Sequence, residues 1–460
     1  MDFFASTPGG AGQPPQPLSS ADRIGNHSWG GSAGTFDLDT LTRTDWVIER
    51  DEMIQATGAP SRKLLSSAYN VIAVDPTPFA DIRNSANVGG IYTSGRTKPD
   101  IVAPASASSN ATPRIASAAV LLISAAHNNP SWSTDPLVTS TTNRVGNTIY
   151  NAERTEIIKA ALMAGADRET SNTSSIDIID YRTNAVDQTN NGLDRRYGAG
   201  QLNIYNSYHV IAASEQNSIE DQASGSGLIG STGFDYDPAF GGANGSNTAA
   251  TYYFSPTTGP AQLTASLVWN LAVDGGSSNK FNGTATLYDL NLRLFDVTDF
   301  ANWVLVGSSE STNQNTENLW QLLDGGKNYA LKVKPGAGQS SFEWDYGLAW
   351  QLTAIQPVVP LVIDPVVLPA AYQNSTYSPQ TLTAANGQPP LTWAIIDGSL
   401  PPGMTLSADG VISGKPTTSG LSYFTVQATD MAAETAALEL QMYVNPTGYV
   451  CGSCHSAPGF

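Results

Sequence analysis

The 460-residue chain is long enough for about two to four domains. Only 13% of its residues are charged, while 40% are hydrophobic. With 42 glycines and 28 prolines, this composition is typical of β-rich, loop-rich extracellular proteins and excludes a disordered chain and a helical cytosolic enzyme. The net charge of −18 argues against nucleic acid and anionic membranes as partners. No run of about 18 apolar residues occurs, so we expect no transmembrane span.

The only two cysteines, Cys451 and Cys454, lie near the C-terminal end, so we expect the body of the protein to be stabilised by apolar burial without disulfides. The first residues contain no basic region followed by an apolar stretch, and therefore no signal peptide. A composition typical of secreted proteins without an export signal predicts that further sequence precedes Met1 in the natural protein. We expect an extracellular or cell-surface location, with the periplasm as an alternative.

The N-terminal half of the sequence predicts an α/β domain. Residues 1–22 are rich in proline, glycine and serine and are expected to form a loop. Residues 23–215 alternate short apolar runs with helical stretches, as α/β domains do. Buried parallel strands are expected at 24–29 and 70–74. Helices are expected at 45–56, 112–127 and 153–165.

The C-terminal half is predicted to be all β. Residues 249–356 alternate apolar and polar positions between turn residues, which predicts a β-sandwich or jelly roll. Residues 370–445 are expected to form a second, smaller all-β domain. Linkers are expected at 216–248 and 357–369, and a tail at 446–460.

Five short motifs follow one another in the α/β region. They are Asn-His-Ser-Trp-Gly-Gly at 26–31, Asn-Val-Ile-Ala-Val at 70–74, Lys-Pro-Asp-Ile-Val-Ala-Pro at 98–104, Ser-Asn-Ala-Thr-Pro at 109–113 and Tyr-Gly-Ala-Gly-Gln-Leu-Asn at 197–203. Each motif alone is a weak signal, but five in one order are specific. In this order they resemble the subtilisin-like serine peptidases, which implies a partial subtilisin-like parallel-sheet domain at 23–215.

The resemblance implies peptide-bond hydrolysis through an acyl-serine, with Ser109 as the nucleophile and a protein or peptide as substrate. A serine at a helix start lies at the positive end of the helix dipole, where adjacent N–H groups can stabilise an oxyanion. Ser28, Trp29 and Gly30 are then expected to bind the substrate backbone. The alternative is that Ser108 or Ser109 is simply a helix N-cap.

The residues that should activate this serine are not evident. A nucleophilic serine needs a base and a carboxylate that orients it, and the family places both before the strand at Asn26. Residues 1–22 contain two aspartates, Asp2 and Asp22, and no histidine. His27 lies inside the substrate-strand motif and is interpreted as a strand residue. His127 and His209 follow the serine and are interpreted as ordinary structural residues.

Two further departures from the family's pattern weaken the expected site. No asparagine occurs between Trp46 and Tyr69, where the family places its oxyanion donor, and losing such a donor typically costs about 10²–10³ in rate. Ala107-Ser108 also replaces the family's Gly-Thr. We therefore expect a peptidase fragment that is inactive or nearly so. The alternative is a non-catalytic extracellular binding or adhesion protein built on a degenerate peptidase scaffold and β modules.

In this family the first strands of the central sheet also precede the strand at Asn26. Without them, the edge of the sheet at that strand would be uncovered. We therefore expect an exposed apolar surface at this edge.

The C-terminal regions resemble accessory modules. Residues 249–356 resemble the β-sandwich that follows many secreted subtilisin-like peptidases; their aspartates would bind calcium or serve as turn and strand-edge residues. Residues 370–445, with Pro-Pro-Leu-Thr-Trp at 389–393 and a tight Asp409-Gly410 turn, resemble a bacterial Ig-like, cadherin-like module. Such modules are spacers or adhesion units and imply no chemistry.

The tail carries Cys451, Cys454 and His455 in a Cys-x-x-Cys-His pattern, which is typical of c-type haem attachment. This pattern would make the chain a haem-linked electron carrier. The alternatives are the start of a further haem domain, a redox or anchoring tail, and a chance match.

Overall fold

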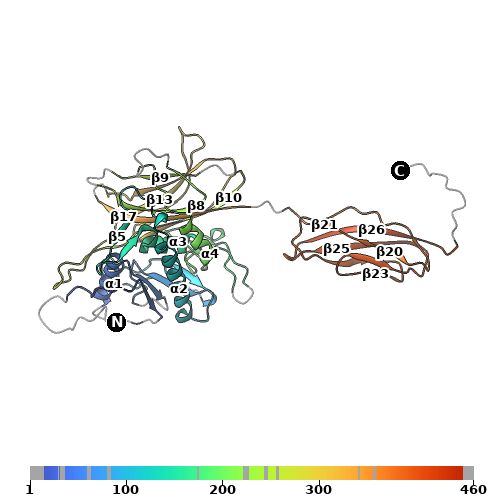
Figure 1. Ribbon diagram of the computed structural model, residues 1–460, viewed down its shortest axis with the longest axis horizontal. Coiled ribbons are helices and arrows are strands. Elements are labelled where there is room, and N and C mark those ends of the chain that lie inside the picture. Colours follow the sequence, from blue (N-terminus) through green and yellow to red (C-terminus); the bar gives the residue numbers. More distant parts are fainter. Residues whose placement is uncertain are drawn as a thin grey trace. The chain divides into compact units, whose positions relative to one another are not determined.

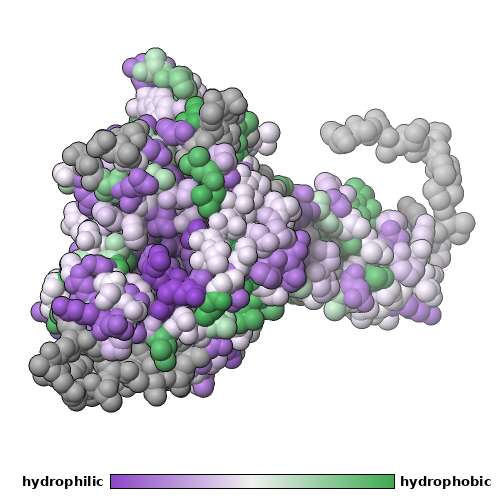
Figure 2. Space-filling view, turned by 60° about the vertical axis from the view of Figure 1, so that its left-hand side comes forward, coloured by the Kyte–Doolittle hydropathy of each residue, from purple (hydrophilic) through white to green (hydrophobic). Residues whose placement is uncertain are grey.

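The computed structural model describes residues 15–28, 31, 37–59, 64–79, 84–172, 176–220, 227–242, 247–254, 258–339, 342–355 and 359–448. The fold is mostly β, with 38% strand and 17% helix. The chain divides into two compact units, Met1–Ile355 and Gln356–Phe460, each with its own elements (Figure 1). On the face drawn in Figure 2, hydrophobic residues form small separate patches within a largely hydrophilic surface.

A parallel sheet of four strands opens the first unit. Its strands lie in the order β1 (Ile24–His27), β2 (Ile54–Gly58), β3 (Ile72–Pro76) and β4 (Ile101–Ala103). Every residue of β2, β3 and β4 is buried, as expected for a parallel sheet covered on both faces. The strand expected at 24–29 is present as β1, which ends at His27, and the strand expected at 70–74 is present as β3, which begins at Ile72.

The helix expected at 45–56 was wrong at both ends. Helix α1 spans Asp37–Asp51, and the residues that were expected to continue it form β2. Glu52 ends the helix in a left-handed conformation, with φ of 53°. Ile54 and Thr57 are β-branched and favour a strand over a helix.

Helix α2 (Ser108–His127) packs against all four strands of the parallel sheet, and two further helices follow it in the chain, α3 (Thr155–Ala164) and α4 (Ile204–Ala212). Helix α2 packs on the sheet through small and aliphatic side chains, including Ala111, Ile115 and Ala119. Helices α3 and α4 lie against α2 and also against strands of the β-sandwich (Figure 1). One continuous core therefore joins Ala119 of α2 to Phe234 and Ala349 of the sandwich.

The sandwich consists of two antiparallel sheets with strand orders β15-β10-β17-β8 and β14-β13-β16-β9-β7. In the latter, β7 adds parallel to β9. The strands are β7 (Leu228–Ile229), β8 (Thr232–Phe240), β9 (Ala250–Phe254), β10 (Ala261–Val268), β13 (Leu290–Asp296), β14 (Val304–Ser309), β15 (Thr316–Leu323), β16 (Tyr329–Pro335) and β17 (Trp344–Ala354). Two small hairpins flank the main sheets, β5–β6 (Ser140–Thr142, Thr148–Tyr150) and β11–β12 (Ala272–Asp274, Thr284–Thr286).

Strands β7 and β8 fall within 216–248, the range that the sequence predicts to be a linker. In β8, Phe234 and Tyr236 are buried in the core that also contains α3 residues. Asp235 and Asp237 are also buried, so both faces of the strand are covered. Alternating apolar and polar residues predict a strand with one exposed face, and β8 is not such a strand.

The second unit is a sandwich of a four-stranded sheet, β19-β26-β25-β22, and a three-stranded sheet, β20-β24-β23, with a short β18–β21 pair. Its strands are β18 (Val362–Ile363), β19 (Ala371–Tyr372), β20 (Tyr377–Thr381), β21 (Ala384–Ala385), β22 (Thr392–Gly398), β23 (Met404–Leu406), β24 (Val411–Gly414), β25 (Gly420–Thr429) and β26 (Thr435–Asn445). Gly410, at φ of 83°, forms the turn before β24, and a Cβ atom there would lie 2.8 Å from Nε1 of the core residue Trp393. Only glycine fits this turn without strain.

Candidate functional site

Ser109 is the second residue of α2 and its side chain is exposed. Ala107 occupies the N-cap position, with φ of −164° and ψ of 160°, so neither Ser108 nor Ser109 caps the helix. No described residue forms a hydrogen bond with the Ser109 hydroxyl. The serine therefore lies at the positive end of the helix dipole, on the solvent side.

The neighbouring Ser108 has a structural partner that the sequence analysis missed. Its hydroxyl donates a 2.8 Å hydrogen bond to Oδ1 of Asp75, a buried carboxylate at the end of β3. A carboxylate at the start of a helix is stabilised by the dipole. This hydrogen bond ties the start of α2 to the end of β3, one residue before Ser109. The only signal in the sequence is an aspartate directly after the 70–74 motif.

The two serines are expected to respond differently to substitution. Ser108→Ala removes a donor from a buried carboxylate and should lower the free energy of unfolding by about 1–2 kcal/mol. Ser109→Ala, at an exposed side chain without a described partner, should leave it unchanged. Thermal melts of both variants measure the difference. Equal stabilities would contradict the structural role given to Ser108.

The expected substrate strand is described only in part, since Trp29 and Gly30 lie outside the described residues. Ser28 follows β1 and exchanges hydrogen bonds of 3.1 and 3.2 Å with the side chain of Asn26. Within the described ranges, no hydrogen bond joins Ser28 to Ser109.

None of the histidines within the described ranges forms a hydrogen bond with Ser109. His27 lies on β1, 2.5 Å from the Gln55 side chain through Nε2, and burial lowers its pKa although this hydrogen bond opposes the shift. His127 is at the far end of α2, about 27 Å from Ser109 at 1.5 Å per helical residue. His209 packs against the ring of Tyr205 on α4, with ring centroids 4.3 Å apart.

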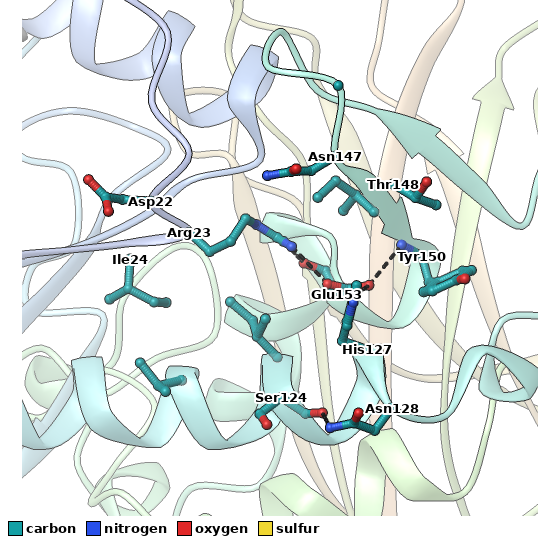
Figure 3. A pocket seen from close by; sticks show the side chains of 14 residues that line it. Asp22, Arg23, Ile24, Ser124, His127, Asn128, Asn147, Thr148, Tyr150 and Glu153 are labelled. Atoms are coloured by element: carbon teal, nitrogen blue, oxygen red, sulfur yellow. Dashed lines mark hydrogen bonds and ion pairs between the residues drawn. The ribbon is translucent and has the colours of Figure 1, made fainter.

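A cavity of about 880 Å³ lies beside β1, the terminal strand of the parallel sheet among the described strands. Ile24 of β1, Val120 and Ile123 of α2 and the turn between β5 and β6 line it (Figure 3). Val120 is 48% exposed. Apolar side chains of β1 and α2 therefore line this cavity.

The polar side of this cavity is organised around the buried carboxylate of Glu153. Arg23 Nη1 donates to Oε2 at 2.7 Å, and the Tyr150 N–H donates to Oε1 at 3.1 Å. His127 Nδ1 lies 3.0 Å from the same Oε1, and Figure 3 shows Arg23 and His127 converging on Glu153. Arg23 also donates to the carbonyls of Glu52 and Glu153. The cluster therefore ties the residue before β1, the end of α2 and the residues before α3 together.

The motif at 98–104 forms a buried ion-pair network. Lys98 Nζ lies 3.1 Å and Lys159 Nζ 3.6 Å from Asp100 Oδ2, which also accepts the Ala73 N–H at 2.7 Å. Burial by itself would raise the pKa of Asp100, but the two ammonium groups and the N–H hold it below its usual value. Burial lowers the pKa of Lys98 to about 8. These motif residues therefore form a buried network that connects β3, the segment before β4 and α3.

The motif at 197–203 packs against the same segment. The Ala199 N–H donates to the Asp100 carbonyl at 2.8 Å, and the Leu202 N–H donates to the Val102 carbonyl at 2.8 Å. At Gly198, with φ of 60°, a Cβ atom would lie 2.4 Å from the carbonyl oxygens of Pro99 and Asp100. The motifs at 70–74, 98–104 and 197–203 thus lie side by side around β3 and β4.

No group of three or more His, Cys, Asp or Glu side chains within the described ranges could hold a metal ion. The haem-attachment residues Cys451, Cys454 and His455 lie outside those ranges. No described helix is both long and apolar enough to cross a membrane.

Comparison with known families identifies one region. The family described as "Putative Ig domain" matches residues 359–445. The second unit therefore contains an Ig-like domain. No curated protein matches the chain.

Solved structures match weakly. A "putative alpha-galactosidase" of Bacteroides fragilis is 22% identical over 20% of this chain and 19% of its own, with a TM-score of 0.17. Mouse cadherin-23 EC22-24 is 17% identical over 34% of this chain and 53% of its own, with a TM-score of 0.22. The tandem Ig repeats of Dlar are 13% identical over 43% of this chain and 98% of their own, with a TM-score of 0.16. The chain spans less than a fifth of the length of that first structure.

Proposed function

We propose that residues 23–215 are the serine-bearing part of a subtilisin-like peptidase domain in an extracellular protein that continues with a β-sandwich and an Ig-like domain. The observation that carries the proposal is the exposed Ser109 in the first turn of α2, directly after the parallel strand β4. Three of the five motifs also pack together around β3 and β4. Composition and the Ig-like domain support the extracellular location.

Among the described residues, none forms a hydrogen bond with the Ser109 hydroxyl. A serine hydroxyl is a weak nucleophile unless an adjacent base takes its proton, and no described histidine is hydrogen-bonded to it. In the proposed family, the aspartate and histidine come from sequence ahead of the strand equivalent to β1. We therefore propose that this chain does not hydrolyse peptide bonds by itself.

The test compares the purified chain with its Ser109→Ala variant on casein and on a fluorogenic peptide library. We expect the two proteins to release product at the same background rate. A rate that exceeds background and disappears in Ser109→Ala would contradict the proposed inactivity and would require a base within the chain. A fluorophosphonate probe, which labels activated serines, should leave both proteins unlabelled.

A second candidate function, non-catalytic binding on a degenerate peptidase scaffold, is favoured by the Asp75–Ser108 hydrogen bond. A buried carboxylate beside the nucleophile position opposes oxyanion formation, which a working peptidase must promote. The two proposals predict different results for Asp75→Asn combined with an external base such as imidazole. A gain of Ser109-dependent hydrolysis supports the peptidase, and no gain supports the scaffold.

A further inference from the structure

The outer faces of the two sheets in the second unit differ in the side chains that they expose. On the four-stranded sheet, Tyr423 of β25 and Tyr443 of β26 are 56% and 50% exposed. Leu421, directly opposite Tyr443, is exposed beside them. The outer face of the three-stranded sheet instead carries short polar side chains such as Ser378 and Thr405. The exposed aromatic side chains of the described part of this unit, Tyr372, Tyr423 and Tyr443, therefore all lie on strands of the four-stranded sheet.

The tyrosines line a groove of about 400 Å³. One wall is the extended segment through Val366 and Leu368, which runs beside β25 and β26. Leu368 is buried in the domain core, and the Tyr377 hydroxyl donates to the carbonyl of the next residue, Pro369, at 3.1 Å. The groove is therefore preformed by residues that the domain holds in place.

The polar groups in this groove are unengaged within the described structure. Gln441 lies directly opposite Tyr423 on the neighbouring strand, and Glu439 is two residues before it. No described residue hydrogen-bonds the side chains of Gln441 and Glu439 or the hydroxyls of Tyr423 and Tyr443. The groove thus offers an amide, a carboxylate and two phenol hydroxyls between exposed ring faces.

We propose that this groove binds a neutral polysaccharide. A pyranose ring presents an apolar face of C–H groups that packs on an aromatic ring, while its hydroxyls hydrogen-bond to amide and carboxylate groups at the ring's edge. Tyr423 and Tyr443 occupy diagonal positions on adjacent strands, which places them about 7–8 Å apart. At this separation, the two rings can contact neighbouring sugar units of one chain.

The charges of the domain favour a neutral ligand over an anionic one. Lys415 is the only basic residue between positions 359 and 448, and it follows β24 on the other sheet. The groove itself contains Glu439 and no cation. A nucleic acid, a phosphate or an acidic polysaccharide would therefore meet uncompensated negative charge.

A protein partner fits the groove less well than a sugar. An apolar protein surface would bury the amide of Gln441 and the carboxylate of Glu439 without hydrogen-bond partners, which costs free energy for each group. A polysaccharide supplies a hydroxyl for each of them. The inference does not depend on the proposed peptidase relationship, because it concerns the second unit alone.

The test is affinity electrophoresis of the full chain in native gels that contain soluble xylan, mannan, hydroxyethyl cellulose or amylose, with polygalacturonate as the acidic comparison. We expect retardation in at least one of the four neutral gels and none in polygalacturonate. In the gel that retards the protein, the Tyr423→Ala, Tyr443→Ala double variant should bind about tenfold more weakly. Thr405→Ala, on the opposite face, is the matched control and should migrate as the unmodified protein does.

Single Tyr→Phe variants separate ring stacking from hydroxyl contacts, because they keep the ring and remove the hydrogen bond. All of these side chains are exposed, so far-UV circular dichroism and melting should be unchanged. Absence of retardation in every neutral gel, or equal retardation of the double variant, overturns the proposal. Self-association that the double variant abolishes, without retardation in any gel, would identify the groove as a protein interface and overturns it too.

Discussion

Replacing Asp100 by asparagine is expected to lower the free energy of unfolding of the first unit by about 3–5 kcal/mol. Asparagine retains an oxygen that can accept the Ala73 N–H, but it leaves Lys98 and Lys159 buried without a counter-charge. Breaking one side of a buried ion pair is costly because the remaining charge cannot be solvated. Chemical denaturation at pH 7, followed by tryptophan fluorescence, measures the change.

The loss of stability in the Asp100→Asn variant should become smaller as the pH rises. Without Asp100, the two lysines fold most easily in their neutral forms, whereas the unfolded chain keeps them protonated up to their ordinary pKa of 10.5. The unfolded state then binds more protons, so the stability of the variant increases with pH in this range relative to the unmodified protein. Glu310→Gln is the control, because Glu310 pairs with Arg293 at 2.8 Å where both side chains are a third exposed. We expect no measurable change for it, and an Asp100→Asn protein as stable as this control would contradict the role of the network.

The sequence predicts elements whose own residues form a continuous apolar run. Strand β3 and the helices α2 and α3 are of this kind, because their apolar composition by itself indicates that they are buried. The boundary between α1 and β2 was missed, since the turn at Glu52 is made by a residue with no intrinsic preference for the left-handed conformation. Local propensity could not indicate that β2 must pair with both β1 and β3.

The sequence predicted the position of Ser109 at the start of a helix, but not the residues that lie around it. The spacing of Ser109 and Pro113 indicates a serine at a helix start, and that is where the structure places it. The Asp75–Ser108 bond and the cluster around Glu153 each join groups more than 20 residues apart in the chain. The core that α3 shares with the β-sandwich also depends on contacts between distant residues, whereas the sequence predicts the α/β region and the sandwich as separate domains. Such non-local contacts leave no periodic signal in a single sequence.

The first unit is expected to lose stability as the pH rises from about 5 to 8. Burial raises the pKa of Glu49 to about 8, with the Asp345 carboxylate adding to the shift and Arg50 opposing it. Burial likewise raises the pKa of Glu317 to about 8 and of Glu215 to about 7, although hydrogen bonds to both carboxyl groups oppose the shift. In an unfolded chain these groups titrate near 4.5.

Between these values the folded state holds protons that the unfolded state has released. The free energy of unfolding therefore falls with rising pH, by about 1.4 kcal/mol per pH unit for each carboxyl group that stays protonated. His27 acts in the opposite sense, because its lowered pKa makes the folded state the less protonated one, but its contribution is complete once the pH exceeds 6.5. We expect a fall in Tm of roughly 10 °C between pH 5 and pH 8, measured by calorimetry.

The Glu317→Gln variant tests how much one of these carboxyl groups contributes to the pH dependence of stability. The Glu317 carboxyl accepts hydrogen bonds from Ser309 Oγ, Ser311 Oγ and the Ser311 N–H, and glutamine has the shape and the neutral charge of its protonated form. The variant should match the unmodified protein near pH 5 and exceed it in stability near pH 8. The neighbouring Glu310→Gln should leave the slope unchanged, because the guanidinium of Arg293 keeps the pKa of Glu310 below its usual value and outside this pH range. A Glu317→Gln protein with the full pH dependence would show that this carboxyl group is ionised in the folded state.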